Sequence, residues 1–338
     1  MDEVEKQGKA ELQQEVLDKS KLYRPLWKVK KEALPLEPLW GVFLFKKAIT
    51  SIVGDPGSGK TTMGYNLGGT LCLGKPYLDI PADEPVNMLY MDFESADSLV
   101  SSRASFVFGE TEIPNFYIYN SPDFYLSQVL KETIDFCREN KINLLAIDNQ
   151  TTAFATRDEN DNAEAARQMK LVRMLANAID SSIILFHHTS KANLSGTRKG
   201  SGAFARARLA DICLNINLVD EEKRDIVYLE MSKNRFDDED KVLWYLKKEK
   251  GQFIRTEPPL GTFGEPQVNT MIYRASAEVL SILKNGSKEE PMKFQAIVAE
   301  MTKRGFNESW ADHAVRKLKQ QNRVCSPRFG FIAIGKSS

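Results

Sequence analysis

The stretch Gly54-Asp55-Pro56-Gly57-Ser58-Gly59-Lys60-Thr61 decides the fold class, because it matches the phosphate-loop pattern G-x-x-x-x-G-K-[ST] at every position. It follows an apolar run, residues 48–53, and precedes a helix-like stretch, residues 60–73. Glycines let backbone N–H groups turn inward around phosphates, and the following helix points its positive end at them. A chance glycine-rich turn with a lysine would not explain this context, so the stretch predicts a nucleotide site.

The residue types in this stretch also predict its ligands. Lys60 is expected to reach the β- and γ-phosphates as a point charge, and the Thr61 hydroxyl to ligate Mg²⁺. ATP and Mg²⁺ are therefore the predicted cofactors. The predicted nucleotide contacts are Gly54, Asp55, Pro56, Gly57, Ser58, Gly59, Lys60, Thr61 and Thr62.

Apolar runs alternate with amphipathic segments on both sides of this stretch. The predicted strands span residues 48–53, 86–92, 143–148, 182–187, 211–218 and 225–232. The predicted helices span residues 60–73, 96–108, 126–139 and 163–179. Near-continuous apolar strands such as residues 142–147 are typical of a buried parallel sheet. We expect an α/β domain with a mainly parallel sheet flanked by helices on both faces.

The order of the polar motifs along the chain resembles the RecA-like ATPase superfamily, and within it the hexameric helicases of the RepA and DnaB kind. The resemblance covers roughly residues 35–245. After the phosphate loop, the motifs that carry it are Asp92-Phe93-Glu94, Asp148-Asn149, His187-His188-Thr189-Ser190-Lys191 and Lys233-Asn234-Arg235. It implies that Glu94 is the general base that polarises the attacking water and that Asp148 is the Mg²⁺-side carboxylate. Asp92 is predicted to be a structural strand-end residue instead.

Two adjacent histidines, His187 and His188, follow an apolar strand. Adjacent residues on a strand point to opposite faces, and no Cys or acidic ligand lies beside them, so a zinc site is not expected. In the RepA-like pattern a polar residue here senses the γ-phosphate. Its shared parity with the core-facing Phe186 selects His188, with His187 as the alternative.

The next loop, residues 191–203, is basic and contains no acidic residue. RecA-like helicases place their central-channel loop here, so Lys191, Arg198 and Lys199 are predicted to contact the backbone of single-stranded DNA. A solvated loop without a specific partner is the alternative.

Lys233 and Arg235 resemble the basic fingers that DnaB-like enzymes project into the neighbouring subunit's site. The resemblance implies a homo-oligomeric ring, with six subunits by the family pattern. The alternative is a pair of ordinary strand-end cations beside the acidic run of residues 237–240.

A linker with three prolines and two glycines in ten residues, 257–266, separates a second module from the first. The predicted organisation is an arm (1–34), an ATPase domain (35–256), a linker (257–269) and a further domain (270–338). Helices are expected at residues 275–283, 293–303 and 308–320, followed by a hairpin within 323–334. Three short helices closed by a hairpin predict a small winged helix-turn-helix domain.

The chain carries 46 basic and 46 acidic residues, and its zero net charge hides a division. Residues 1–269 contain 34 Lys plus Arg against 40 Asp plus Glu, whereas residues 270–338 contain 12 against 6. The basic third helix predicts duplex DNA contacts by Arg316, Lys317 and Lys319, with Trp310 and Val315 as core anchors. A partner protein on this surface is the alternative.

Cysteine usage and hydropathy indicate the compartment. Cys72, Cys137, Cys213 and Cys325 form no C-x-x-C pair, so buried free thiols in a reducing compartment are expected. The first residues lack the apolar core of a signal peptide, and no apolar stretch approaches the roughly 18 residues of a spanning helix. A soluble cytoplasmic protein without a membrane partner is predicted.

These observations support three hypotheses about function. The leading one is an Mg²⁺-dependent ATPase that forms a ring around single-stranded DNA and acts as a helicase or translocase in replication or related DNA metabolism. A RecA-like recombination, repair or signalling ATPase without unwinding activity is the second. The third is a DNA-binding regulator whose ATPase core switches assembly state.

Overall fold

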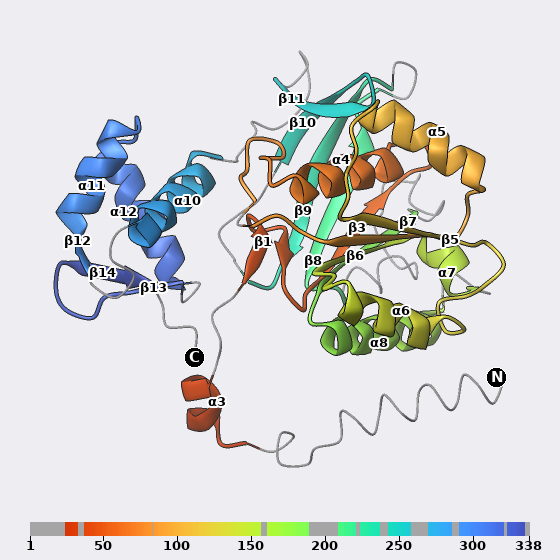
Figure 1. Ribbon diagram of the computed structural model, residues 1–338, viewed down its shortest axis with the longest axis horizontal. Coiled ribbons are helices and arrows are strands. Elements are labelled where there is room, and N and C mark those ends of the chain that lie inside the picture. Colours follow the sequence, from red (N-terminus) through yellow and green to blue (C-terminus); the bar gives the residue numbers. More distant parts are fainter. Residues whose placement is uncertain are drawn as a thin grey trace.

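The centre of the chain is a nine-stranded sheet in the order β11-β10-β9-β8-β3-β7-β6-β4-β5 (Figure 1). The computed structural model describes residues 24–32, 37–82, 84–156, 161–188, 209–220, 224–236, 243–257, 270–285, 291–320 and 323–334. The sheet strands are β3 (Ile49–Gly54), β4 (Met88–Asp92), β5 (Phe116–Asn120), β6 (Leu144–Asp148), β7 (Ser182–His188), β8 (Ile212–Leu218), β9 (Ile226–Asn234), β10 (Leu243–Glu249) and β11 (Gln252–Thr256).

One part of this sheet is parallel, as the apolar runs predict. Strands β8, β3, β7, β6, β4 and β5 pair in parallel in that order. Strands β3, β4 and β6 are buried along their whole length, because both faces of the sheet are covered. The α/β class is therefore confirmed. Strand β5, an edge strand of mostly half-exposed residues, was not predicted.

The other part is antiparallel, so the sheet is mixed and the expectation of a mainly parallel sheet needs correction. Strands β9, β10 and β11 pair antiparallel with their neighbours. Only residues 219–225 join β8 to β9, and a parallel crossover needs a dozen or more. The β10–β11 turn consists of Lys250 and Gly251, with φ of 47° and 76°, which suits a two-residue hairpin.

Helices cover both faces of the sheet. Helices α4 (Lys60–Cys72) and α5 (Asp97–Phe108) lie on one face, and α6 (Leu130–Glu139) and α8 (Asn162–Ile179) on the other (Figure 1). Strand alternation divides the core accordingly: Leu144 and Ala146 join the cluster beneath α4, and Leu145 and Ile147 join the cluster beneath α6 and α8.

The segment before the phosphate loop packs onto the antiparallel part. It contains α3 (Leu26–Glu32), β1 (Pro38–Trp40) and β2 (Leu44–Phe45). The rings of Trp40 and Phe43 lie 6.3 Å and 5.0 Å from that of Trp244 on β10. Of the predicted arm, residues 1–34, only 24–32 are described, and no residue of α3 is buried.

The carboxy-terminal module has a core of its own. Helices α10 (Thr270–Asn285), α11 (Phe294–Lys303) and α12 (Glu308–Gln320) accompany a three-stranded antiparallel sheet in the order β12-β14-β13. Its strands are β12 (Met292–Lys293), β13 (Val324–Cys325) and β14 (Phe331–Ile334). Val315 is buried in this core and Trp310 packs against it half-buried, as expected.

Two further expectations can be compared with the structure. All four cysteines are free, but only Cys72, Cys137 and Cys213 are buried; Cys325 is exposed on β13, so its predicted burial is wrong. Within the described ranges, no helix combines the length and apolarity needed to cross a membrane.

Candidate active site

The predicted phosphate-binding loop lies at the carboxyl edge of the parallel strands. Residues 55–59 connect β3 to α4, which begins at Lys60. Gly54 at the end of β3 pairs with His188 on one side and Ile216 on the other. Asp92 and Asp148 are register partners at the ends of β4 and β6. The fold thus brings the polar motifs that follow β3, β4, β6 and β7 to one edge.

Lys60 lies under this loop, and backbone carbonyls hold it. Its Nζ donates to the carbonyl oxygens of Gly54 (2.7 Å) and Asp55 (3.1 Å) and lies 3.2 Å from Nδ1 of His188. The side chain is buried, and burial lowers the pKa of Lys60 to about 8 although carboxylates nearby raise it. Near neutral pH Lys60 is therefore a buried cation that no described carboxylate pairs with directly.

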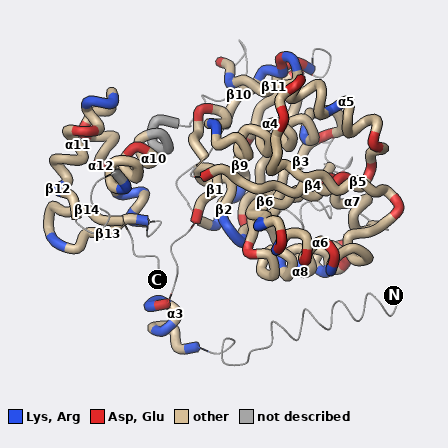
Figure 2. The backbone as a smooth tube through the Cα atoms, viewed as in Figure 1, with Lys and Arg blue, Asp and Glu red and all other residues tan. Residues whose placement is uncertain are grey.

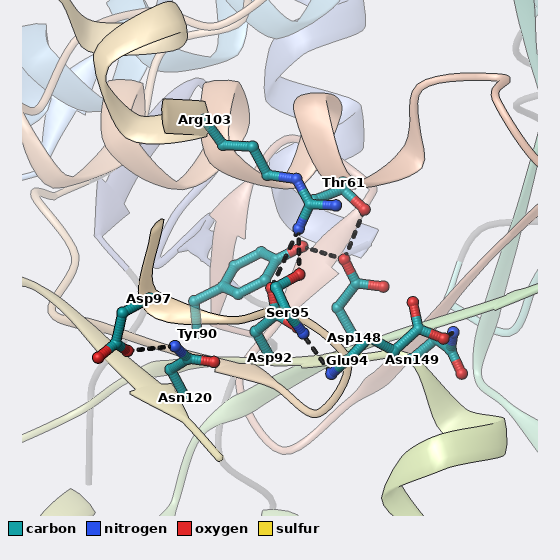
Figure 3. A network of polar contacts seen from close by, with 10 residues as sticks. All are labelled: Thr61, Tyr90, Asp92, Glu94, Ser95, Asp97, Arg103, Asn120, Asp148 and Asn149. Atoms are coloured by element: carbon teal, nitrogen blue, oxygen red, sulfur yellow. Dashed lines mark hydrogen bonds and ion pairs between the residues drawn. The ribbon is translucent and has the colours of Figure 1, made fainter. Parts of the chain in front are cut away.

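Thr61 and Asp148 are linked directly, and a third residue completes the link. The Thr61 hydroxyl donates to Oδ2 of Asp148 at 2.7 Å, and the Tyr90 hydroxyl donates to the same oxygen at 2.6 Å (Figure 3). Asp148 is 6% exposed, and burial raises its pKa, while both hydrogen bonds favour the carboxylate form. Burial also raises the pKa of Tyr90, which keeps its phenol a donor. The role of Tyr90 was not predicted.

Asp92 has a structural position, in line with its predicted role. Its carboxylate accepts hydrogen bonds from the backbone N–H groups of Glu94 and Ser95, both at 2.9 Å, and from Arg103 at 3.1 Å. It is 1% exposed. Asp92 therefore fixes the turn that carries Glu94.

Glu94 projects from that turn toward the end of β6. Its Oε1 accepts a hydrogen bond from Nδ2 of Asn149, and the Asp148–Asn149 peptide bond is cis. Nδ2 of Asn149 also lies 3.5 Å from Nε2 of His188. Partial desolvation, followed by the charge of Asp148, raises the pKa of Glu94. One contact chain thus runs from Glu94 through Asn149 and His188 to Lys60.

The two histidines point in opposite directions, as strand alternation requires. His188 contacts Lys60, whereas His187 is buried with its Nε2 at the Ser51 hydroxyl. In the part of the chain that the structure describes, no group of three or more His, Cys, Asp or Glu residues is placed to hold a metal ion. The position of His188 is the one expected of the γ-phosphate sensor, a role that remains a prediction.

Lys233 and Arg235 lie away from this site. Strand β9 runs antiparallel, so Asn234 pairs with Ile212, which pairs with Thr50 near the start of β3. Four residues of β3 separate that register from Gly54, about 13 Å at roughly 3.3 Å per residue. Neither side chain belongs to its own chain's phosphate site.

At that opposite edge, Arg235 shares a carboxylate with a second arginine. Its guanidinium lies 3.2 Å from Oδ1 of Asp211, and Arg173 lies 2.5 Å from Oδ2. The backbone N–H of Ile49 donates to Oδ2 at 2.9 Å. Asp211 is 6% exposed, so it joins three segments of the fold.

Two cations at the phosphate loop were missed. Arg224 donates from Nη2 to the Pro56 carbonyl oxygen at 3.0 Å, and Nζ of Lys248 lies 3.3 Å from that of Gly57. Strand alternation carried one available signal, because Lys248 shares the parity of the buried Trp244 and Leu246. Nothing in the sequence around Arg224 marks it.

The predicted DNA contacts divide into three groups. Lys191, Arg198 and Lys199 lie outside the described residues. Arg316 and Lys319 are exposed on α12, where Arg316 pairs with Asp312 at 2.6 Å. Lys317 is only 9% exposed, because it faces the helical core, and this burial contradicts a direct DNA contact.

The residues present fit a triphosphate with Mg²⁺. A buried cation held by carbonyls, Lys60, lies beside a hydroxyl–carboxylate pair of hard oxygen donors, Thr61 and Asp148. Thr62 follows on the first turn of α4 and is half-buried. The Ser58 hydroxyl is buried in the loop and has no hydrogen-bond partner among the described residues.

Comparison with known proteins agrees with this geometry. A protein-family model described as an AAA domain matches residues 24–193, half of the chain. A solved structure whose title describes an ATPase domain is similar with a TM-score of 0.51 and 14% identity, over 69% of this chain and 96% of that one. Another, "Crystal structure of the RadB recombinase", has a TM-score of 0.44 and 15% identity, over 63% and 92%. The search of curated proteins gave no match.

Proposed function

The chain belongs to the family of AAA domains, and from this premise we propose that it is an Mg²⁺-dependent ATP hydrolase that acts on DNA. The observation that carries the proposal is the convergence of Lys60, the Thr61–Asp148 pair and Glu94 at one edge of the sheet. The likeness in fold to a solved ATPase domain supports the first half of the proposal.

Each residue of the site has a role in this proposal. Lys60 binds the β- and γ-phosphates, and Thr61 and Asp148 hold the metal ion directly or through water. Bound Mg²⁺ would neutralise charge on the phosphate oxygens. Glu94 accepts a proton from water as the water oxygen bonds to the γ-phosphorus and the bond to the ADP oxygen breaks. The raised pKa of Glu94 makes it a better proton acceptor than an exposed carboxylate.

Asn149 and His188 link the water-activating side to the phosphate side. Asn149 orients Glu94 by a hydrogen bond, and His188 lies between Asn149 and Lys60. Loss of the γ-phosphate would change the surroundings of Lys60 and His188 first. This contact chain supports His188 as the sensor residue.

The carboxy-terminal module supports an action on DNA. Its order of helix, strand, helix, helix and two further strands is the order of a winged helix. Figure 2 shows Lys and Arg along α11, α12 and the β13–β14 hairpin. Phe329 at the tip of that hairpin is fully exposed beside Arg328, which suits an aromatic contact with a base next to a phosphate contact.

A ring of subunits, with six as the family pattern suggests, remains part of the proposal through Lys233 and Arg235. Because they lie at the edge opposite to their own phosphate loop, a neighbouring subunit's site is the one they could serve. Arg235 would then exchange Asp211 for a phosphate. An Arg235→Ala variant should keep nucleotide binding and lose DNA-stimulated hydrolysis, and unaltered stimulated turnover would exclude the finger role.

The test of the proposal is ATP turnover without DNA, with single-stranded DNA and with duplex. Stimulation by single strands supports a motor that tracks one strand, and deletion of residues 270–338 should weaken duplex binding if the module contacts duplex. Absence of turnover under all three conditions would refute the hydrolase.

A RecA-like ATPase that does not unwind DNA is the second candidate. The pairing of Arg235 with Asp211 within one chain favours it, because a finger so engaged is not poised for a neighbour. Sizing with ATP together with a strand-displacement assay separates the candidates: assembly without unwinding supports this one. Slow turnover with sequence-specific duplex binding would instead support an ATP-switched regulator.

A further inference from the structure

Two basic side chains of the antiparallel part contact the outer side of the phosphate loop. Arg224 precedes β9 and reaches the Pro56 carbonyl oxygen at 3.0 Å, and Lys248 on β10 reaches that of Gly57 at 3.3 Å. Both belong to the same chain as the loop. They are therefore distinct from the strand-end pair Lys233 and Arg235.

The backbone around both cations is built to place them there. Arg224 has a φ of 52°, a left-handed conformation that is uncommon for a non-glycine residue. A side chain at Gly57 would overlap the Arg224 guanidinium, so the loop leaves room for it. Such an unfavourable conformation persists where its surroundings impose it.

Asn66 fixes the hairpin that carries Lys248. Its Nδ2 donates to the Gly251 carbonyl oxygen at 2.7 Å, and its Oδ1 accepts from the backbone N–H of Phe253 at 2.8 Å. Asn66 is 1% exposed on α4, the helix that begins at the phosphate loop. The hairpin and the loop therefore form one rigid arrangement.

The two cations are not neutralised by direct ion pairs. Across the ranges that the structure describes, no carboxylate lies within 4 Å of the charged nitrogens of Arg224 or Lys248. Burial, followed by the charge of Arg224, lowers the pKa of Lys248, although Asp225 offsets part of this. Two like charges beside one loop are unfavourable in isolation and become favourable when an anion binds between them.

We propose that Arg224 and Lys248 form a same-chain cationic site for the polyphosphate of the nucleotide bound at the phosphate loop. The inference rests on the proposed ATP binding and adds ligands that the phosphate-loop motif does not include. The contact to Pro56 uses one of the five N–H donors of the Arg224 guanidinium, so further donors can reach a phosphate. A single subunit then holds three cations for one triphosphate.

Charge-removing variants that keep a donor test this site. Arg224→Gln and Lys248→Gln retain an amide N–H for the loop carbonyls but lose the positive charge. We expect each to raise the Kd for MgATP about tenfold, which corresponds to about 1.4 kcal/mol, to raise that for ADP less and to leave that for AMP unchanged. Isothermal titration calorimetry at constant ionic strength measures all three.

Matched controls make the result specific. Lys247→Gln removes a charge from the same strand on the opposite face, where Lys247 pairs with Glu249, and should bind like the wild type. Arg224→Lys and Lys248→Arg keep the charge and should recover most of the affinity. If the glutamine variants do not fold, the lysine and arginine variants and the salt dependence of wild-type ATP affinity still test the charge requirement.

The outcomes are distinct. Wild-type affinity in the glutamine variants, or an equal loss for ATP and AMP, would overturn the inference, because the two residues would then only brace the loop. If the wild-type protein binds ATP no better than a Lys60→Ala variant, the proposed function itself fails instead.

Discussion

The two ends of the central sheet both carry clustered arginine and lysine side chains, but oxygen atoms of different kinds hold them. At the carboxyl end, Lys60, Arg224 and Lys248 contact backbone carbonyls. At the amino end, Arg173 and Arg235 share the carboxylate of Asp211. A carbonyl orients a cation and leaves its charge in place, whereas a carboxylate cancels it. The first end is suited to bind an anion and the second to join segments of the chain.

The largest expected effect is at Lys60. Lys60→Met should reduce ATP turnover at least about a thousandfold, since the point charge on the transferred phosphates is lost. Because the residue is a buried cation with a depressed pKa, the same change should not lower the melting temperature. Turnover assays and thermal unfolding of one preparation measure both. A large loss of stability would mean that Lys60 is structural, like Asp211.

Glu94 tests the chemistry at the carboxyl end separately from binding. Glu94→Gln keeps a side chain that can contact Asn149 but cannot accept a proton from water, so turnover should fall about a hundredfold while ATP affinity stays within about twofold. Single-turnover hydrolysis and equilibrium binding provide the two readouts. The exposed Glu110→Gln is the control, and equal turnover in both variants would remove Glu94 from catalysis.

Asp211 tests the amino end. Asp211→Asn should lower the free energy of unfolding by about 2 kcal/mol, roughly a thirtyfold change in the folding equilibrium, because two arginines lose a shared buried carboxylate. ATP affinity should not change. Urea denaturation measures the stability, and Asp180→Asn, whose carboxylate pairs only with more exposed lysines, should cost less. A loss of ATP affinity without a loss of stability would contradict the comparison.

The smallest effect is the response to pH. The pKa of Lys60 is about 8 in the folded protein, below its usual 10.5, so ATP affinity should fall up to about tenfold per pH unit above 8 as the amine loses its proton. Stability moves oppositely: the unfolded state holds more protons between these pH values, so this group makes stability rise with pH. Titration calorimetry and urea denaturation at pH 7, 8 and 9 compare them. Parallel loss of both would indicate alkaline unfolding instead.

The sequence predicts this site best where the sheet is parallel. The ends of parallel strands meet at one edge, so Lys60, Glu94 and Asp148 could be grouped from their positions after apolar runs. Tyr90 could not, because its value depends on which neighbour its hydroxyl reaches across the sheet. Arg224 and Lys248 depend on antiparallel pairing, whose register is set by turn geometry and packing rather than by a local motif.

The contacts of Trp244 and Asn66 bear on where the chain can be shortened. The match to the AAA-domain family ends at residue 193, yet Trp244 packs on Trp40 and Phe43, and Asn66 uses both ends of its amide on the β10–β11 turn. A fragment cut at the limit of the family match would expose these aromatic rings to water and leave a buried amide unsatisfied. The smallest independently folding piece with a phosphate loop therefore extends to Thr256, and expression trials should place their boundary there.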